Sequence, residues 1–161
     1  EKGTVFRVEL AFDRMEEKEK TEAESEALAG KRLLLAEDDR LCGEILCELL
    51  EDETGRPVSI TANGRAALKM FESANGEYDA IIMDVQMPVM NGYEAARAIR
   101  RSGCGNAKTV PIIALTADAS EESARSAADS GMNGCLAKPV NINRLRKAVA
   151  AALKSLSVAY R

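Results

Sequence analysis

The chain has 161 residues, of which 46% are hydrophobic and 30% are charged, and its formal net charge is −4. A chain of this length suits one folded domain with a tail, and the composition excludes a mainly disordered, collagen-like or membrane-spanning protein. The sequence contains no His, which excludes a Ser-His-Asp triad, a His-ligated zinc site and imidazole acid–base catalysis. The four cysteines form no C-x-x-C pair, so we expect free thiols in a reduced, cytosolic environment.

The first 30 residues differ from the rest in charge and in pattern. Residues 1–30 hold nine acidic and five basic residues, whereas residues 31–161 hold 17 of each. Apolar and polar residues alternate from Val5 to Phe12, which predicts a short strand within residues 1–12. Residues 13–30 lack apolar periodicity, which predicts an acidic linker in the form of a solvated coil or an exposed helix. The neutral remainder has no basic excess, so we expect no nucleic-acid binding.

From Lys31 onward, short apolar runs alternate with longer amphipathic segments. The apolar runs predict strands at residues 32–36, 58–61, 80–83, 112–115 and 135–137. The segments after them predict helices at residues 40–53, 65–73, 93–101, 121–130 and 143–154. Five such units predict an α/β fold, a doubly wound parallel sheet with helices on both faces, because parallel strands need crossover helices. No G-x-G-x-x-G turn follows the first strand, so a dinucleotide-binding fold is not indicated.

Polar side chains suited to chemistry follow four of the five predicted strands. In chain order they are Glu37, Asp38 and Asp39, then Asp84, Thr116 and Lys138. Because the carboxyl ends of parallel strands form the ligand crevice of a doubly wound sheet, we expect these side chains to meet there. Clustered carboxylates repel one another unless a cation joins them, and a site made of oxygen atoms alone favours Mg²⁺. A carboxylate can also attack phosphorus to give an aspartyl phosphate, while an ammonium and a hydroxyl stabilise the transferred charge.

Four sequence blocks carry a resemblance to a known family. They are LLLAEDD at residues 33–39, IIMDVQMPVMNG at 81–92, PIIALTA at 111–117 and GMNGCLAKP at 131–139. In this order and spacing they resemble the signature blocks of the response-regulator receiver domain, over residues 31–155. The resemblance implies a flavodoxin-like fold with five parallel strands in the order 2-1-3-4-5.

The resemblance also implies a role for each site residue. It implies that Asp84 is the phosphoacceptor and that Thr116 and Lys138 contact the phosphoryl group. The implied ligands of Mg²⁺ are Asp38 and Asp84, Glu37 through a water molecule, and the backbone carbonyl of Gln86. The implied reaction is the Mg²⁺-dependent transfer of a phosphoryl group from a phosphohistidine to Asp84, after which the group is passed on or regulates an attached kinase.

Three neighbouring positions have interpretations of their own. Asp39 is better explained as the start of the following helix, where an acid suits the positive end of the helix dipole. The resemblance implies a cis peptide bond between Lys138 and Pro139. Cys135 departs from the family, because receivers usually carry Tyr, Phe or His at this position. Our hypothesis is that Cys135 is an inert buried residue and that the conformational switch runs through Thr116 and its loop.

The N-terminal segment adds a second resemblance. The run GTVFRVEL at residues 3–10 resembles the last strand of the ATP-binding domain of sensor histidine kinases. The implied layout is that of a hybrid histidine kinase: a kinase remnant at residues 1–12, an acidic linker at 13–30, a receiver at 31–155 and a tail at 156–161. The implied partners are a histidine-kinase catalytic region, in the same parent chain or in trans, and a histidine phosphotransfer protein. We expect a cytoplasmic segment without membrane contact, in a parent protein compatible with anchoring in the inner membrane.

Two alternatives belong to other functional classes. A phosphatase of the haloacid-dehalogenase class also uses an Asp nucleophile with Mg²⁺. That class carries an Asp-x-Asp motif after the first strand, whereas Asp84 follows the third. A degenerate receiver would bind partners without being phosphorylated. Whether the segment counts as an enzyme stays open, because a receiver catalyses its own phosphorylation and dephosphorylation while this segment has no kinase active site.

Overall fold

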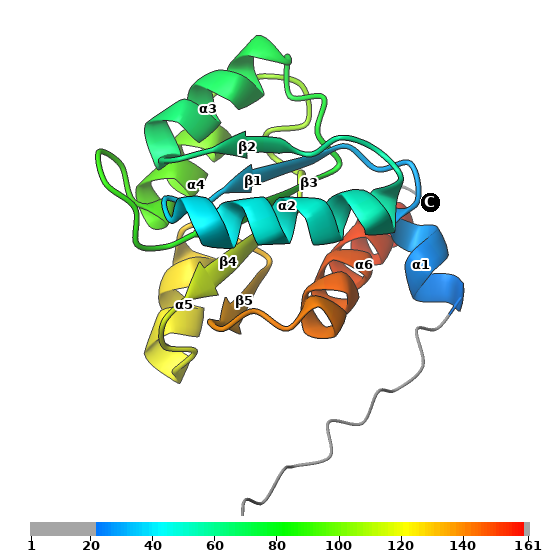
Figure 1. Cartoon of the computed structure of the whole chain (residues 1–161). Helices are drawn as coiled ribbons and strands as arrows, with labels where there is room; N and C mark the ends of the chain where they lie inside the picture. The colour runs from blue at the N-terminus through cyan, green and yellow to red at the C-terminus, as the bar shows by residue number, and fades with distance from the viewer. Residues whose placement is uncertain (1–21, 160–161) are drawn as a thin grey trace, which may run out of the picture.

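The computed structural model describes residues 22–159 (Figure 1). In chain order its elements are α1 (Glu22–Leu28), β1 (Leu33–Ala36), α2 (Arg40–Thr54), β2 (Ser59–Thr61), α3 (Gly64–Ser73), β3 (Ala80–Asp84), α4 (Gly92–Arg101), β4 (Ile112–Thr116), α5 (Glu121–Asp129), β5 (Gly134–Ala137) and α6 (Ile142–Ala159). Within this range, no helix is both long enough and apolar enough to cross a membrane. The predicted strand at residues 1–12 lies outside the described residues.

The five strands form one parallel sheet in the order β2-β1-β3-β4-β5. This confirms the predicted flavodoxin-like topology. The central strand β3 pairs with β1 through Leu35 and Ile82 and with β4 through Ile82 and Ile113. Each strand is followed by a helix, so all the strands end at the same edge of the sheet, which we call the carboxyl edge. The opposite edge, where the strands begin, is the amino edge.

Two apolar cores lie on the two faces of the sheet, because successive strand residues point to opposite faces. Leu34 packs with Phe71 in a cluster that also takes side chains from α3, α4 and α5. Leu35 packs with Leu50 and Val149 in a second cluster, which takes side chains from α1, α2 and α6. All residues of β1, β3 and β4 are buried, which explains why these strands read as continuous apolar runs.

Side-chain caps set where the helices begin. Each of α2, α3, α4 and α5 is preceded by a residue whose side-chain oxygen accepts the backbone N–H three positions on, and these residues are Asp39, Asn63, Asn91 and Ser120. Such caps satisfy the free N–H groups of the first helical turn. The four caps follow the ends of β1, β2, β3 and β4, and they therefore fix the loops of the carboxyl edge. The interpretation of Asp39 as a helix start is confirmed.

The ends of the domain differ from the sequence expectation. Residues 22–28, within the predicted linker, form α1, and its Leu28 is fully buried in the second core. The last helix continues to Ala159, into the predicted tail. The strand β5 is only partly buried, since it is the edge strand and has one neighbour. Periodicity did not reveal α1, because two alanines and one leucine in a seven-residue helix are too few to give a clear pattern.

Candidate functional site

Asp84 occupies the centre of the carboxyl edge. It is the last residue of β3, the middle strand, and only 3% of its surface is exposed. The next residue is tied to the neighbouring strand, since the Val85 N–H donates to the Leu115 carbonyl at 2.8 Å. The Gln86 N–H donates to Asp84 Oδ1 at 3.0 Å, which fixes the carboxylate against its own loop. The acceptor predicted from sequence is therefore held in place by backbone atoms.

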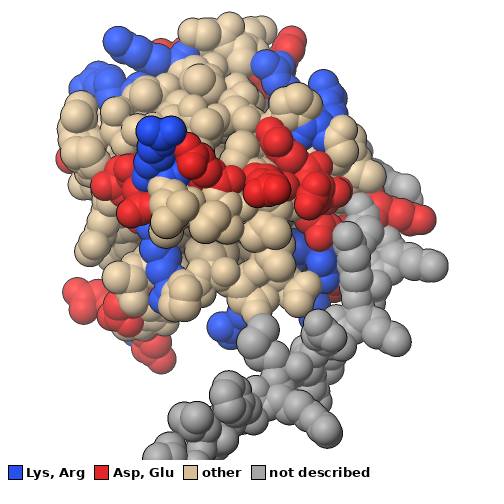
Figure 2. All heavy atoms as spheres, viewed as in Figure 1, with Lys and Arg blue, Asp and Glu red and all other residues tan. Residues whose placement is uncertain are grey.

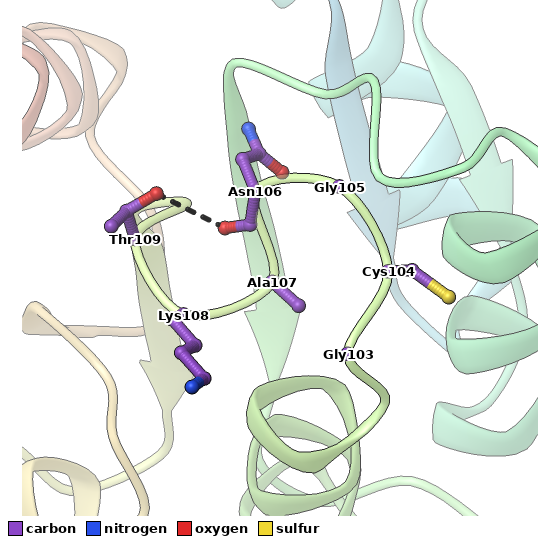
Figure 3. A pocket seen from close by; sticks show the side chains of 7 residues that line it. All are labelled: Gly103, Cys104, Gly105, Asn106, Ala107, Lys108 and Thr109. Atoms are coloured by element: carbon purple, nitrogen blue, oxygen red, sulfur yellow. Dashed lines mark hydrogen bonds between the residues drawn. The ribbon is translucent and has the colours of Figure 1, made fainter.

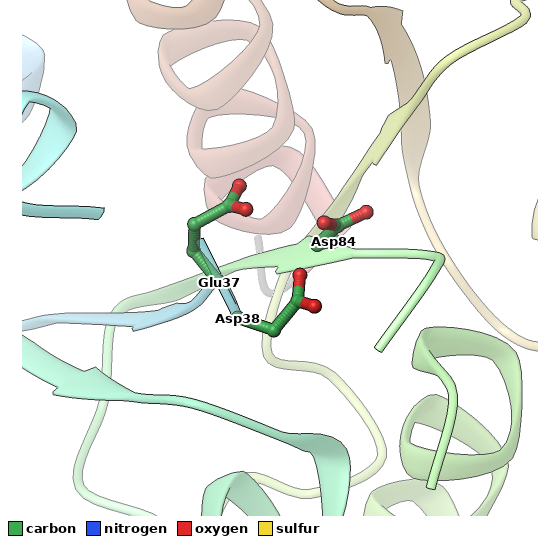
Figure 4. Close-up of side chains that lie close together, drawn as sticks. All are labelled: Glu37, Asp38 and Asp84. Carbon is green, nitrogen blue, oxygen red and sulfur yellow. The ribbon is translucent and has the colours of Figure 1, made fainter. Parts of the chain in front are cut away.

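Two further carboxylates reach Asp84 from the end of β1 (Figure 4). The Glu37 N–H donates to the Thr61 carbonyl of β2 at 2.9 Å, and the residue is 2% exposed. Asp38 is exposed to solvent. One carboxylate oxygen of each of the three acids lies within 4.8 Å of the others. The structure thus brings Glu37, Asp38 and Asp84 together.

Lys138 joins this group from the end of β5. Its Nζ lies 2.6 Å from Asp84 Oδ2, and 2.9 and 2.7 Å from the Glu37 Oε1 and Oε2 atoms. Its N–H donates to the Thr116 carbonyl at 2.7 Å, and the Lys138–Pro139 peptide bond is cis, as predicted. The sequence placed Lys138 near the acceptor, but the second ion pair, to Glu37, was not predicted.

Burial and charge act in opposite directions on the pKa values of this cluster. Burial raises the pKa of Glu37; the hydrogen bond from Lys138 opposes this rise and the negative charge of Asp84 adds to it. Burial alone would lower the pKa of Lys138, but its hydrogen bonds to Asp84 and Glu37 outweigh this and the pKa is raised. The surrounding carboxylates therefore hold the Lys138 ammonium in its charged form.

This cluster fits a divalent cation. Mg²⁺ prefers oxygen ligands at ~2.0–2.1 Å, which places opposite ligands ~4.2 Å apart. One oxygen of each of the three carboxylates lies within 4.8 Å of the other two, so the acids are gathered closely enough to face one ion, and Asp38 is exposed to solvent. The amide of Gln86 lies beside Asp84, so the backbone of the predicted fourth ligand is at the site. The donor set of the chain is consistent with the predicted magnesium ligands.

Thr116 lies at the same edge, and the hydrogen bonds of its hydroxyl are made within its own loop. It ends β4, next to β3. Its hydroxyl donates to the Asp118 carbonyl at 3.1 Å and accepts the Asp118 N–H at 3.3 Å. The hydroxyl therefore closes a turn of its own loop. To donate to a group bound to Asp84, the hydroxyl has to give up its hydrogen bond to the Asp118 carbonyl.

One residue that supports the site was not predicted. Gly92 begins α4 directly beneath the acceptor, and its N–H donates to the Val85 carbonyl at 2.9 Å. A Cβ atom at Gly92 would collide with the Asp84 carbonyl oxygen and would lie 2.9 Å from the Val85 Cα. Only glycine allows this close approach of two backbones. The glycine that ends the second sequence block was the available signal.

Cys135 lies in β5, behind the loop of Thr116. It is partly buried, its thiol is free, and it packs against the first core together with Tyr93. Burial raises the pKa of the Cys135 thiol, and the charge of Asp118 adds to this. The Tyr93 hydroxyl donates to the Ser123 carbonyl at 3.4 Å and so joins α4 to α5. A thiol with a raised pKa is a poor nucleophile at neutral pH, in agreement with the hypothesis of an inert residue.

Another hollow lies at the opposite edge of the sheet. A cavity of about 450 Å³ is enclosed by the loop between α4 and β4, residues 103–109 (Figure 3). This loop leads into the start of β4, so the cavity lies at the amino edge. Apart from Lys108, the residues that line this cavity are neutral. Within the loop, the Thr109 hydroxyl donates a hydrogen bond to the Asn106 carbonyl, as Figure 3 shows. The charged groups gather at Asp84 instead, which makes the carboxyl edge the candidate site.

Comparisons with known proteins identify the family of the chain. The model of the family described as the response regulator receiver domain matches residues 33–150. Hybrid signal transduction histidine kinase I of Dictyostelium discoideum is 32% identical over 114 residues, 69% of this chain and 6% of that protein. The chain spans less than a fifth of the length of the curated relatives it matches.

Solved structures show the same fold. The receiver domain of sensor histidine kinase PA1611 from Pseudomonas aeruginosa, with a magnesium ion coordinated in its active site cleft, is 36% identical, with a TM-score of 0.67. That alignment covers 78% of this chain and 99% of the other. The receiver domain of Saccharomyces cerevisiae Ssk1, crystallised with the histidine phosphotransfer signaling protein Ypd1, is 31% identical, with a TM-score of 0.67 and coverage of 76% and 88%. From the strand order, the site and the match over residues 33–150, the chain belongs to the response regulator receiver domain family.

Proposed function

We propose that this receiver domain accepts a phosphoryl group on Asp84 and acts in a two-component phosphorelay. One observation carries the proposal: the Asp84 carboxylate meets two more carboxylates and one ammonium at a single point of the carboxyl edge. This cluster sets three carboxylates against one ammonium, and one of the three, Asp38, is exposed to solvent. The excess suits a site that takes up a cation and then an anionic phosphoryl group.

The chemistry follows from the atoms present. A carboxylate oxygen of Asp84 attacks phosphorus, the bond from phosphorus to the donor imidazole nitrogen breaks, and that nitrogen leaves with the electron pair. Lys138 already contacts Asp84 Oδ2 at 2.6 Å and stabilises the negative charge of the transferred group. Thr116 turns its hydroxyl from Asp118 to a phosphoryl oxygen. The chain contains no His, so the phosphohistidine donor belongs to another segment or another protein.

Glu37, Asp38 and Asp84, with the backbone carbonyl of Gln86, are the residues that would hold Mg²⁺. When bound, the ion neutralises charge on the phosphoryl oxygens and so lowers the repulsion between them and the carboxylates. Glu37 also keeps Lys138 in place through its own ion pair. The magnesium ion seen in the Pseudomonas receiver supports the same use of the acidic cluster here.

A docking surface for the phosphoryl donor or acceptor lies beside Asp84. A hollow of about 160 Å³ between the start of α2 and the segment after β5 is lined by Glu37, Cys42, Ile45, Leu46, Lys138, Pro139 and Val140. Leu41 and Ile45, on α2, are 67% and 50% exposed. Further along, α2 carries exposed acids, and Figure 2 shows acidic side chains gathered on this face. An apolar helix face flanked by basic residues, on a histidine phosphotransfer protein, fits this surface.

The proposed parent protein is a hybrid histidine kinase. Two relatives from Dictyostelium discoideum are named as hybrid signal transduction histidine kinases, and residues 3–10 resemble the last strand of a kinase ATP-binding domain. We assign residues 1–12 to that domain and expect the receiver in the cytoplasm, where a kinase has ATP. The partners are then the kinase catalytic region as phosphoryl source and a histidine phosphotransfer protein as next acceptor.

Incubation of the chain with Mg²⁺ and a small acyl phosphate tests the function. We expect the intact mass to rise by one phosphoryl group, and we expect no rise in Asp84→Asn or when the metal is chelated. Turnover of many substrate equivalents would identify a phosphatase instead. If the wild-type chain gains no mass although it is folded, the domain is an interaction module and the proposal is wrong.

A further inference from the structure

A third buried charge lies far from the phosphoacceptor. Among residues 22–159, the charged residues classed as buried are Glu37, Asp84 and Arg146. Arg146 lies on α6 and is 2% exposed. Its Nε lies 3.6 Å from Glu24 Oε2 on α1, and its Nη1 lies 3.3 Å from Glu53 Oε1 on α2. Arg146 therefore joins three helices, and its role is separate from the chemistry at Asp84.

The helix α1 lies against α2 and α6 at the amino edge (Figure 1). Leu28 is fully buried in the second core. Beyond the helix, the Gly30 N–H donates to the Thr54 carbonyl at 2.8 Å, and Arg56 Nη1 donates to the Gly30 carbonyl at 3.2 Å. Among the described side chains, α1 is therefore held by Leu28, with Ala27 packed beside it, and by the ion pair to Arg146, while Gly30, just beyond the helix, makes two hydrogen bonds near the end of α2.

These contacts make the helix conditional on docking. An isolated helix shorter than ~12–15 residues is marginal in water, and α1 has seven. The Arg146–Glu24 pair, at 3.6 Å, is longer than a hydrogen bond, and its desolvation offsets most of its attraction. Folding of α1 and its attachment to α6 are therefore one event with a small net free energy.

We propose that α1 is a reversible strap, which docks against α2 and α6 and anchors the segment before the receiver to the amino edge. Docked, it holds that segment at the edge opposite Asp84 and leaves the carboxyl edge open to a phosphotransfer partner. Released, it lets the receiver move freely relative to that segment. Leu28 supplies the apolar contact, and the ion pair between Arg146 and Glu24 fixes where α1 lies on α6. The contacts that hold the strap lie on α1, α2 and α6 and include no residue of the Asp84 cluster.

Hydrogen–deuterium exchange of the 161-residue chain tests the strap. In wild type, we expect the amides of residues 22–30 to exchange through local opening, faster than those of β1 and β3. In Arg146→Gln we expect their exchange to accelerate roughly tenfold or more, because the docked state loses its charge partner, while β1 and β3 keep their protection. Arg144→Gln, at an exposed position of the same helix, is the matched control and leaves the exchange unchanged.

Glu24→Gln separates release of the strap from damage to the fold, since Glu24 lies on α1 itself. We expect a smaller acceleration in the same amides, and less effect of Arg146→Gln in the Glu24→Gln background than in wild type, because the two residues act as a pair. Unchanged exchange of residues 22–30 in both single variants would overturn the proposal. Exchange of α1 at the same rate as β1 in every variant would also overturn it, since α1 would then open only with the whole domain.

Discussion

At the carboxyl edge of the sheet, the Lys138 ammonium lies 2.6 Å from Asp84 and 2.7 Å from Glu37, whereas at the amino edge the Arg146 guanidinium stays 3.3 Å from Glu53 and 3.6 Å from Glu24. Each cluster sets one cation against carboxylates from other elements. The first also has an exposed third acid, so a cation from solvent can reach it. The second is covered by three helices. Both clusters hold more acids than bases, but only the first combines short contacts with an acid open to solvent, which suits a site for ligands, whereas the longer contacts of the second suit an attachment between helices.

The largest test of this difference is Lys138→Met. We expect phosphorylation by an acyl phosphate to slow about 100-fold or more, because the developing charge loses its ammonium. In metal-free buffer, the free energy of unfolding should fall by about 2–3 kcal/mol, since two buried carboxylates lose their partner, although Lys138 keeps 28% side-chain exposure. Intact-mass kinetics and urea denaturation measure the two effects.

Lys31→Met is the matched control for this substitution. Lys31 pairs with Asp79 at 3.2 Å, and both side chains are 37% exposed. Such a surface pair contributes less than about 1 kcal/mol, and phosphorylation should be unaffected. Equal losses in the two lysine variants would mean that the carboxyl-edge cluster is no more than another surface ion pair.

Asp38→Asn sharpens the role of the surplus charge. Mg²⁺ at about 100 times its dissociation constant should raise the free energy of unfolding of the wild-type chain by about 2.7 kcal/mol. Asp38 is exposed, so without metal the substitution should change stability by less than ~0.5 kcal/mol, yet most of the gain from Mg²⁺ should be lost. The control is Asp52→Asn, an exposed acid on α2, which should keep the full gain. A complete gain in Asp38→Asn would remove Asp38 from the metal ligands.

Gly92→Ala tests how tightly the backbone holds the acceptor. The added methyl group meets the Asp84 carbonyl and the Val85 Cα, which cannot move without shifting β3. We expect a loss of about 1–3 kcal/mol and slower phosphorylation. At Gly43 the same substitution would meet the end of the Ile60 side chain at 2.8 Å, which can rotate away, so thermal unfolding should show little or no loss there. A neutral Gly92→Ala would show that the loop adapts.

The smallest effect is expected at Cys135. The Cys135→Ser variant should be phosphorylated at a rate within about twofold of wild type, a change below ~0.5 kcal/mol in the barrier. Because burial raises the thiol pKa, iodoacetamide should react slowly at neutral pH and faster only as the pH rises beyond the usual cysteine pKa. Loss of phosphorylation in this variant would contradict the inert role.

The sheet and most of the site could be predicted because their signals are dense in the sequence. Three strands are buried on both faces, so they appear as unbroken apolar runs, and the polar residues that follow them must reach the carboxyl edge. The predicted roles of Asp84 and Lys138 stay predictions, but their contact follows from this rule. The predicted bounds of all five strands differ from the observed ones by one residue, at buried strands and at the edge strand β5 alike.

Interactions that depend on one residue and a distant partner could not be predicted. The burial of Arg146 depends on Glu24 and Glu53, which come from two other helices. A charged residue in an amphipathic helix is normally assigned to the solvent face, and no spacing rule marks the exception. The Thr116 hydroxyl was expected to contact the phosphoryl group on the acceptor. In the structure it forms hydrogen bonds with the backbone of Asp118, two residues on, because such local backbone groups compete for a threonine hydroxyl.

The capped helices have an electrostatic consequence for the acceptor. Because α2, α3, α4 and α5 all begin at the carboxyl edge, the positive ends of four peptide dipoles, each worth about half an elementary charge, face the region around Asp84. These partial charges belong to the backbone, so neither protonation nor side-chain motion removes them. They attract an approaching dianion toward a pocket whose own side chains repel it. The polypeptide scaffold thus supplies a fixed positive field at this edge, which would favour an anion there whatever the titration state of the acids.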